Sequence, residues 1–167
     1  MEFGVGRAAT AIHDDVLKGL GRVAVSFGLL ELSLASLMDD LIGTDIMVSC
    51  AIVSALAFRR RIDVLVSLVG IRAPLFSKAD VNTLANRLTD AEDRRNRAFH
   101  SIFLAAGPTG TPVQYKDKVS RDGYRISTKD VDPRVINADA DFIAEVAADV
   151  TRAGGEIIPL VGKLPSA

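Results

Sequence analysis

The segment Arg95-Asn96-Arg97-Ala98-Phe99-His100 places three chemically useful side chains within six residues. On a helix of about 3.6 residues per turn, Asn96 and His100 lie one turn apart on the same face, with Arg95 beside Asn96. A histidine exchanges protons near neutral pH, and a guanidinium binds two phosphate oxygens at once. The segment therefore predicts a site for proton transfer on a substrate that carries phosphate.

The motif lies late on a predicted helix that begins after Ser77, its expected N-cap. Apolar residues recur in steps of three and four from Val81 to Ile102, and Arg95 takes one position of this stripe. Because an unpaired buried charge is costly, we expect Arg95 to have a carboxylate partner or to face a polar cleft. The partner we predict is Glu31, which lies next to the apolar seam of the first helix.

That first helix is predicted over residues 14–42, with Asp14 or Asp15 as its N-cap and Gly43 as its stop. Its seam runs in steps of three and four through Val16, Leu20, Val23, Phe27, Leu30, Leu34, Leu37 and Leu41. A seam this long could be covered in part by a partner subunit as well as by the same chain. Tight packing against a neighbouring helix is the expected reason for its internal glycines, which are Gly19, Gly21 and Gly28.

The remaining elements complete a mainly α-helical bundle. Helical stretches are expected over residues 46–57 and 58–71, and Ala73-Pro74 then breaks the pattern. The motif helix is expected to end at residues 107–110, Gly-Pro-Thr-Gly, and strands over 113–119 and 124–128 flank an Asp122-Gly123 turn. A last helix is expected over 137–158, with Gly154-Gly155 as an interruption. The fold class predicted is all-α in the main: four to five helices with a small β-hairpin before the last, in a single domain over residues 1–167.

Composition limits the partners and the compartment. The chain has 167 residues, 49% of them apolar, and a net charge of -1, so no general attraction to nucleic acid or anionic lipid is expected. The lone cysteine, Cys50, is predicted to be a buried structural thiol in a reducing cytoplasm. Residues 1–10 lack the pattern of a signal peptide. The apolar stretch 23–42 carries Glu31 and two aspartates, so we expect a core helix and not a membrane span.

The pattern of Arg, a polar residue, three further residues and His resembles the defining motif of the HEPN superfamily. The order of elements before it is also similar to that family: a long first helix with an internal Glu31, then the segment 58–63 (Phe-Arg-Arg-Arg-Ile-Asp), then the motif helix. The resemblance covers about residues 14 to 105. The hairpin and the last helix match it only loosely.

The resemblance implies a helical bundle that forms a homodimer, with two copies of the motif meeting in a composite cleft. In active members that cleft is a metal-independent endoribonuclease. By the same resemblance, His100 acts as general acid or base when the 2′-OH of RNA attacks the adjacent phosphate. Arg95 stabilises the charge of the transition state, and Asn96 holds the phosphate or orients His100. The products are a 2′,3′-cyclic phosphate and a free 5′-OH.

Several alternatives stay open. Arg59, Arg60 and Arg61 could join Arg94 and Arg97 in one substrate-binding patch, or form a solvated face paired with Asp63, Glu92 and Asp93. The superfamily also contains non-catalytic interaction or ligand-binding modules, in which an Arg95–Glu31 pair would be structural.

Some members are toxins with an antitoxin-like partner protein, and they carry a modified tyrosine where this chain has Ile102. That switch cannot operate at this position. No metal is expected, because His13 lacks a second set of ligands at usable spacing, and no cofactor-binding loop is present.

Overall fold

The computed structural model describes residues 13–106, 111–120 and 123–163. Within these ranges the chain forms five α-helices and a three-stranded antiparallel sheet, so the mainly helical fold is confirmed. The helices are α2 (Asp14–Ile42), α3 (Ile46–Ser54), α4 (Phe58–Arg72), α5 (Lys78–Phe99) and α6 (Pro133–Ile157). The strands are β1 (Ile102–Ala106), β2 (Thr111–Ser120) and β3 (Gly123–Asp130), and a short 3₁₀ helix, η1 (Ile158–Leu160), follows α6.

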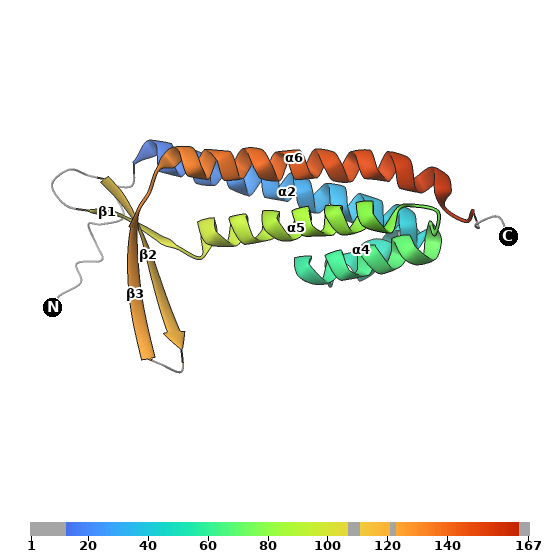
Figure 1. The fold of residues 1–167 in the computed structure, drawn as a ribbon, viewed down its shortest axis with the longest axis horizontal. Coiled ribbons are helices and arrows are strands. Elements are labelled where there is room, and N and C mark those ends of the chain that lie inside the picture. Colours follow the sequence, from blue (N-terminus) through green and yellow to red (C-terminus); the bar gives the residue numbers. More distant parts are fainter. Residues whose placement is uncertain (1–12, 107–110, 121–122, 164–167) are drawn as a thin grey trace.

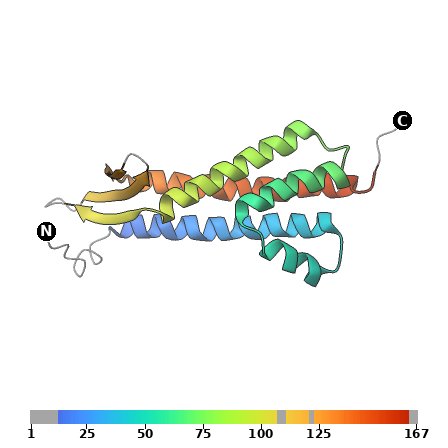
Figure 2. The same ribbon diagram turned by 90° about the horizontal axis from the view of Figure 1, so that it is seen from below.

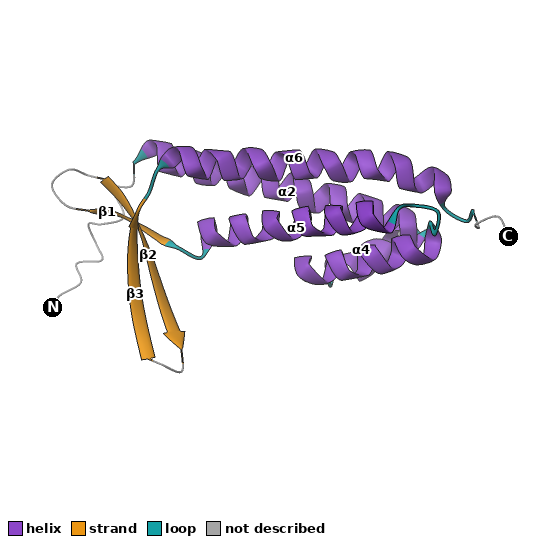
Figure 3. Cartoon of the chain, in the orientation of Figure 1, coloured by secondary structure: helices purple, strands orange, loops and turns teal. Residues whose placement is uncertain are grey.

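Helices α2 and α6 lie side by side along the whole bundle, as Figure 1 shows, and they share its most extensive packing. Helix α5 packs against both, while α4 packs on α5 and α2 (Figure 2). The strands are confined to the end of the bundle where α5 stops and α6 starts (Figure 3). The sheet therefore stands directly beside the C-terminal end of the motif helix.

The predicted seam of α2 is the centre of the core, and the helix has the predicted bounds. Seven of its eight seam residues are buried and Leu20 is partly buried, all within the single chain. The helix ends at Gly43, whose φ of 64° lies in the left-handed region that favours glycine. The predicted N-cap is wrong: His13 caps the helix, its Nδ1 accepting from the Asp15 N–H at 3.4 Å. By length and composition alone α2 could also cross a membrane, but in the structure its seam faces the other helices.

Gly19 lets α2 and α6 approach closely. A Cβ atom at this position would lie 3.0 Å from Cγ2 of Ile136 on α6, which is closer than ordinary van der Waals contact. The same explanation was predicted for Gly21 and Gly28, and there it is wrong, because both lie on an open face with nothing within 4 Å. Sequence spacing does not show which side of the helix its neighbours occupy.

Helices α3 and α4 are separate, with a short break at residues 55–57. Only Ser49 and Val53 of α3 are buried, so the prediction of a buried Cys50 is wrong. The exposed Cys50 thiol lies 3.6 Å from Oδ2 of Asp39, with Sγ as the donor. Partial desolvation, together with the nearby Asp39 carboxylate, raises the pKa of the Cys50 thiol. Most residues of α3 are apolar, yet only one narrow side of this helix packs against the core.

The sheet has the order β1-β2-β3. The predicted hairpin of β2 and β3 is confirmed, while β1 was expected to be the end of the motif helix. Ile102 instead pairs with Tyr115 in the sheet, and α5 ends at Phe99. The helical periodicity continues through Ile102, so it could not predict that the chain changes to a strand there. That strand forms because it pairs with β2, a segment farther along the chain. The residues predicted to end the helix, 107–110, and Asp122 of the predicted turn lie outside the described residues.

Helix α6 starts earlier than predicted, at Pro133. Asp132 is its N-cap and accepts from the Arg134 N–H at 2.9 Å, and Pro133 at the first helical position fits the helix start. Hydrogen bonding and the positive charge of Arg134 lower the pKa of Asp132. Gly154-Gly155 does not interrupt the helix, which continues to Ile157. A Cβ at Gly154 would lie 3.5 Å from Cδ1 of Leu37 on α2, which is ordinary van der Waals contact, so packing there does not require a glycine.

The close approach at Gly19 gives a stability prediction. Gly19→Val places branched carbons against Ile136, and overpacking of this kind costs about 1–3 kcal/mol of unfolding free energy. The control is Gly70→Ala on α4, where a Cβ meets nothing within 4 Å and the gain in helix propensity is about 0.5–1 kcal/mol. Urea denaturation of both variants measures the difference. Equal stability of the two variants would contradict the packing described here.

Candidate functional site

The motif occupies the last turn of α5 and its C-cap. Arg95 and Asn96 are helical, and His100 is the capping residue, with its N–H bonded to the Asn96 carbonyl at 2.9 Å. His100 is exposed to solvent, and Arg95 and Asn96 are half-buried. The structure therefore brings the three predicted side chains to one helix end, with the imidazole at the surface.

The sheet fixes where this helix ends. The Ser101 hydroxyl donates to the Arg97 carbonyl at 2.6 Å, and Nε2 of Gln114 donates to the same carbonyl at 3.1 Å. Gln114 also donates to the Ser101 hydroxyl at 2.6 Å. Free carbonyls at a helix end need partners, and here a side chain from β2 supplies one. Sequence reasoning missed Gln114, because no local pattern links it to α5.

Arg95 is held by aromatic rings. Its guanidinium carbon lies 5.2 Å from the centroid of Phe27 and 5.6 Å from that of Phe99, within range of cation–π attraction. Its Nη1 donates to Oδ1 of Asn96 at 2.9 Å. The Phe27 ring also packs against Phe58 at the start of α4, with ring centroids 4.8 Å apart. Phe27 was identified only as a core residue, although its place in the seam put it on the side of α2 that faces α5.

The predicted Arg95–Glu31 ion pair is not present in the described structure, where no carboxylate oxygen lies within 4.0 Å of the Arg95 guanidinium. The other described arginines of α5 each have a carboxylate within 4.0 Å. Arg87 lies 2.8 Å from Asp149, and Arg94 lies 2.8 Å from Asp139, which also attracts Arg97 at 3.8 Å. Among the described arginines of α5, Arg95 alone has no carboxylate oxygen within 4.0 Å of its guanidinium.

The predicted patch of basic residues is divided between two sides of α5. On the α4 side, Arg59 pairs with Glu92 at 2.9 Å and with Asp93 at 3.3 Å. The other two α4 arginines are engaged locally: Arg60 lies 3.4 Å from Asp63, and Arg61 donates to the Leu56 carbonyl at 3.0 Å. On the other side, Arg94 and Arg97 face Asp139 of α6. Arg59 and Arg60 therefore make the local ion pairs with Glu92, Asp93 and Asp63 that the alternative named, whereas Arg94 and Arg97 pair with Asp139, which it did not.

The surface around His100 combines apolar and cationic character. Phe99 exposes 45% of its area next to His100 in the sequence, while Phe103 on β1 is buried. Within the described ranges, no group of three or more His, Cys, Asp or Glu side chains is placed to hold a metal ion. The chemistry this surface can perform is proton transfer and the binding of an anion.

Comparisons with protein-family models, curated proteins and solved structures gave no match for this chain.

The stacked environment of Arg95 predicts a modest role in stability. We expect Arg95→Ala to lower the unfolding free energy by about 1 kcal/mol, the contribution of a partly exposed cation–π contact. A loss of about 3–5 kcal/mol would instead reveal an orphaned buried carboxylate, such as that of Glu31. Arg97→Ala is the control, since this exposed residue should change stability by less than about 0.5 kcal/mol. Urea titration followed by circular dichroism measures both.

Proposed function

We propose that this chain is a HEPN-type, metal-independent endoribonuclease that acts as a homodimer. The observation that carries the proposal is the end of α5, where an arginine without a carboxylate oxygen within 4.0 Å bonds to Asn96, and the exposed His100 caps the same helix. A guanidinium held by ring faces and by an amide retains its full charge for an incoming phosphate. The other described arginines of α5 each have a carboxylate within 4.0 Å, so Arg95 is the α5 arginine that an anion can reach without competing with such a partner.

The proposed reaction uses only groups of the motif. His100 of one copy removes the proton from the 2′-OH of RNA, and the 2′ oxygen attacks the adjacent phosphorus. The bond from phosphorus to the 5′ oxygen breaks, and His100 of the second copy donates a proton to that leaving oxygen. The products are a 2′,3′-cyclic phosphate and a free 5′-OH, and neither water nor metal is consumed.

Arg95 and Asn96 have distinct parts in this scheme. Arg95 stabilises the negative charge that grows on the phosphate oxygens in the transition state. Asn96 accepts from Arg95 through Oδ1, which leaves its amide N–H groups to donate to a phosphate oxygen. Phe27 and Phe99 position the guanidinium between them.

A homodimer would supply the second histidine. Helix α4 begins at Phe58 and runs away from the sheet, so it lies beside the half of the bundle remote from the motif (Figure 2). The motif end of α5 presents the exposed ring of Phe99 next to His100. An apolar ring at the edge of a polar site is the kind of residue that anchors subunit contacts.

The exposed free thiol of Cys50 fits a reducing compartment such as the cytoplasm.

The second candidate is a non-catalytic dimeric module of the same fold that binds a ligand or a partner protein, such as an antitoxin-like chain. One observation favours it: Arg59, Arg60, Arg94 and Arg97 are paired with carboxylates of the same chain. The net charge is -1. Little free positive charge therefore remains to hold a long stretch of RNA backbone.

Cleavage of RNA in the presence of EDTA separates the two candidates. We expect the wild-type protein to leave 2′,3′-cyclic phosphate ends, identified by mass spectrometry of the fragments. His100→Ala and Arg95→Ala should each lower the rate by at least about 100-fold, through loss of proton transfer and of charge stabilisation. His13→Ala is the matched control and should cleave normally, because His13 lies outside the motif, and its described contact is a hydrogen bond from the Asp15 N–H at the start of α2. Intact RNA with wild-type protein, or equal cleavage by His100→Ala, would contradict the nuclease proposal.

Mixing subunits tests the composite cleft. After wild-type protein is re-equilibrated with an excess of His100→Ala, most wild-type chains share a dimer that holds one functional histidine. We expect activity per wild-type chain to fall by about 10-fold or more, since one proton transfer then lacks its catalyst. An excess of His13→Ala should leave it unchanged. Activity that is independent of the added His100→Ala would show that each chain acts alone.

A further inference from the structure

The side of α2 turned away from the core carries a second stripe of regularly spaced residues. Its members recur in steps of three and four, and all of them are exposed: Lys18, Arg22, Val25, Leu29, Leu32, Ser36 and Asp40. We call this set the outer stripe. Val25, Leu29 and Leu32 expose 66%, 55% and 67% of their area, which is unusual for three apolar side chains in a row on one helix face. The spacing is that of a coiled-coil seam.

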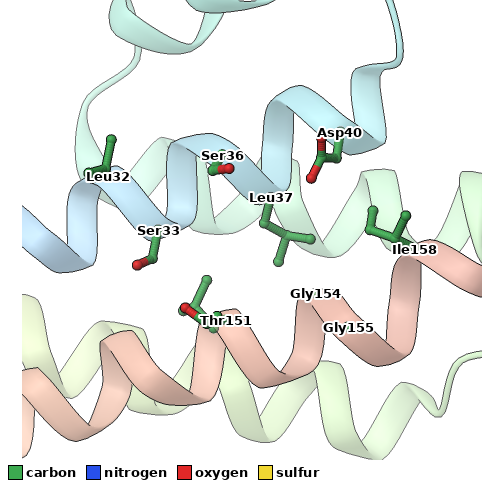
Figure 4. Close-up of a pocket in the computed structure, with 10 residues that line it drawn as sticks. Leu32, Ser33, Ser36, Leu37, Asp40, Thr151, Gly154, Gly155 and Ile158 are labelled. Carbon is green, nitrogen blue, oxygen red and sulfur yellow. The ribbon is translucent and has the colours of Figure 1, made fainter.

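Hollows lie on both sides of these apolar side chains. Towards the N-terminal end, Gly21 and Ser26 line a shallow depression next to Val25. Towards the C-terminal end, Ser33 and Ser36 line a groove between α2 and α6, whose other wall is Thr151 and Gly155 (Figure 4). Small residues on each side of a ridge of large ones leave room for a second ridge to interdigitate.

Charge along the outer stripe reverses from one end to the other. Lys18 precedes Leu29 by as many residues as Asp40 follows it, and both are exposed. Within the described chain Lys18 has only a weak contact with Asp15 at 3.8 Å, and Asp40 has no cation within 4.0 Å. Two copies crossing at Leu29 in opposite directions would set each Lys18 against the partner's Asp40. A parallel pair would instead place like charges together, so charge selects the antiparallel arrangement.

We propose that two copies of this chain associate through antiparallel contact of their outer stripes, with the two Leu29 side chains meeting at the twofold axis. In this register Leu32 of each copy enters the depression beside Gly21 and Ser26 of the other. Val25 enters the groove at Ser33. Both ends close with a Lys18–Asp40 pair, so the contact is self-complementary, as a twofold interface requires.

This contact is separate from the motif dimer. Leu29 lies about 200° around α2 from Phe27, the ring that supports Arg95, at 3.6 residues per turn. The outer-stripe contact therefore leaves the motif surface open. If the motif dimer also forms, the two contacts together build a four-chain assembly. The outer-stripe contact does not depend on whether the motif is catalytic.

Engineered cysteines test the register, in a Cys50→Ser background that removes the native thiol. Leu29→Cys should form an intermolecular disulfide under mild oxidation, because the two copies meet at this residue. Val25→Cys should not, since its symmetry mate lies about 12 Å away along the helix, at 1.5 Å per residue. The double variant Val25→Cys/Ser33→Cys should cross-link again. All three positions lie outside the core, so circular dichroism spectra should match the parent protein.

Charge exchange supplies an independent test by analytical ultracentrifugation. Lys18→Glu and Asp40→Lys should each weaken association by about 3–10-fold, because each twofold contact loses two exposed ion pairs. The double variant Lys18→Glu/Asp40→Lys should recover the parent affinity. Recovery supports antiparallel pairing of these ends, and additive weakening would overturn it.

Three further results would overturn the proposal: no association at any protein concentration, equal cross-linking at Leu29 and Val25, or cosedimentation of the wild-type chain with anionic lipid vesicles. The acidic residues Asp39, Asp40 and Asp45 disfavour the lipid surface. Two variants distinguish failure of this proposal from failure of the nuclease proposal. His100→Ala should leave the Leu29→Cys cross-link intact, while Leu29→Asp should halve the mass of the assembly without changing RNA cleavage per chain.

Discussion

The structure depends on the burial of one aliphatic row of α2 against α6, α5 and α4. Leu30, Leu34 and Leu41 on this row are fully buried, and residues from the other four helices complete the same core. Burying side chains of this kind stabilises the fold by about 1.5–3 kcal/mol each before the entropic cost of ordering the chain. One side of α2 faces the core, where Gly19 lets α6 approach closely. The opposite side of the helix is exposed to solvent. Both proposed surfaces are defined by their position relative to this row.

The motif sits where the core stripe of α5 changes character. Val81, Leu84 and Leu88 are buried along this stripe, and Arg95 continues it after α4 no longer covers the site. At this point the arginine is half-buried, and its guanidinium lies within cation–π range of the Phe27 ring. An arginine in an apolar stripe is thereby accommodated without a carboxylate. The same accommodation leaves its charge available, which is the physical basis of the nuclease proposal.

Periodicity predicted the elements well where a helix buries a regular stripe. The bounds of α2, the Ser77 cap of α5 and the hairpin of β2 and β3 followed from spacing, capping and turn residues. Spacing failed where distant residues decide the outcome. Ile102 fits the helical stripe of α5, yet it pairs with Tyr115 because Gln114 and Ser101 end the helix at its last carbonyls. The three motif residues could be named from the sequence. Phe27 as the support of Arg95 could not, and the expected Glu31 pair did not form.

The bond from Gln114 to the Arg97 carbonyl has a mechanical consequence. The last turn of a helix frays readily because its carbonyls lack partners within the helix. Here the Gln114 amide of the middle strand bonds to one of these carbonyls, so it restrains the turn that precedes His100. A change in the bend of β2 at Gln114 would therefore displace the C-terminal end of α5, and with it the support of the imidazole.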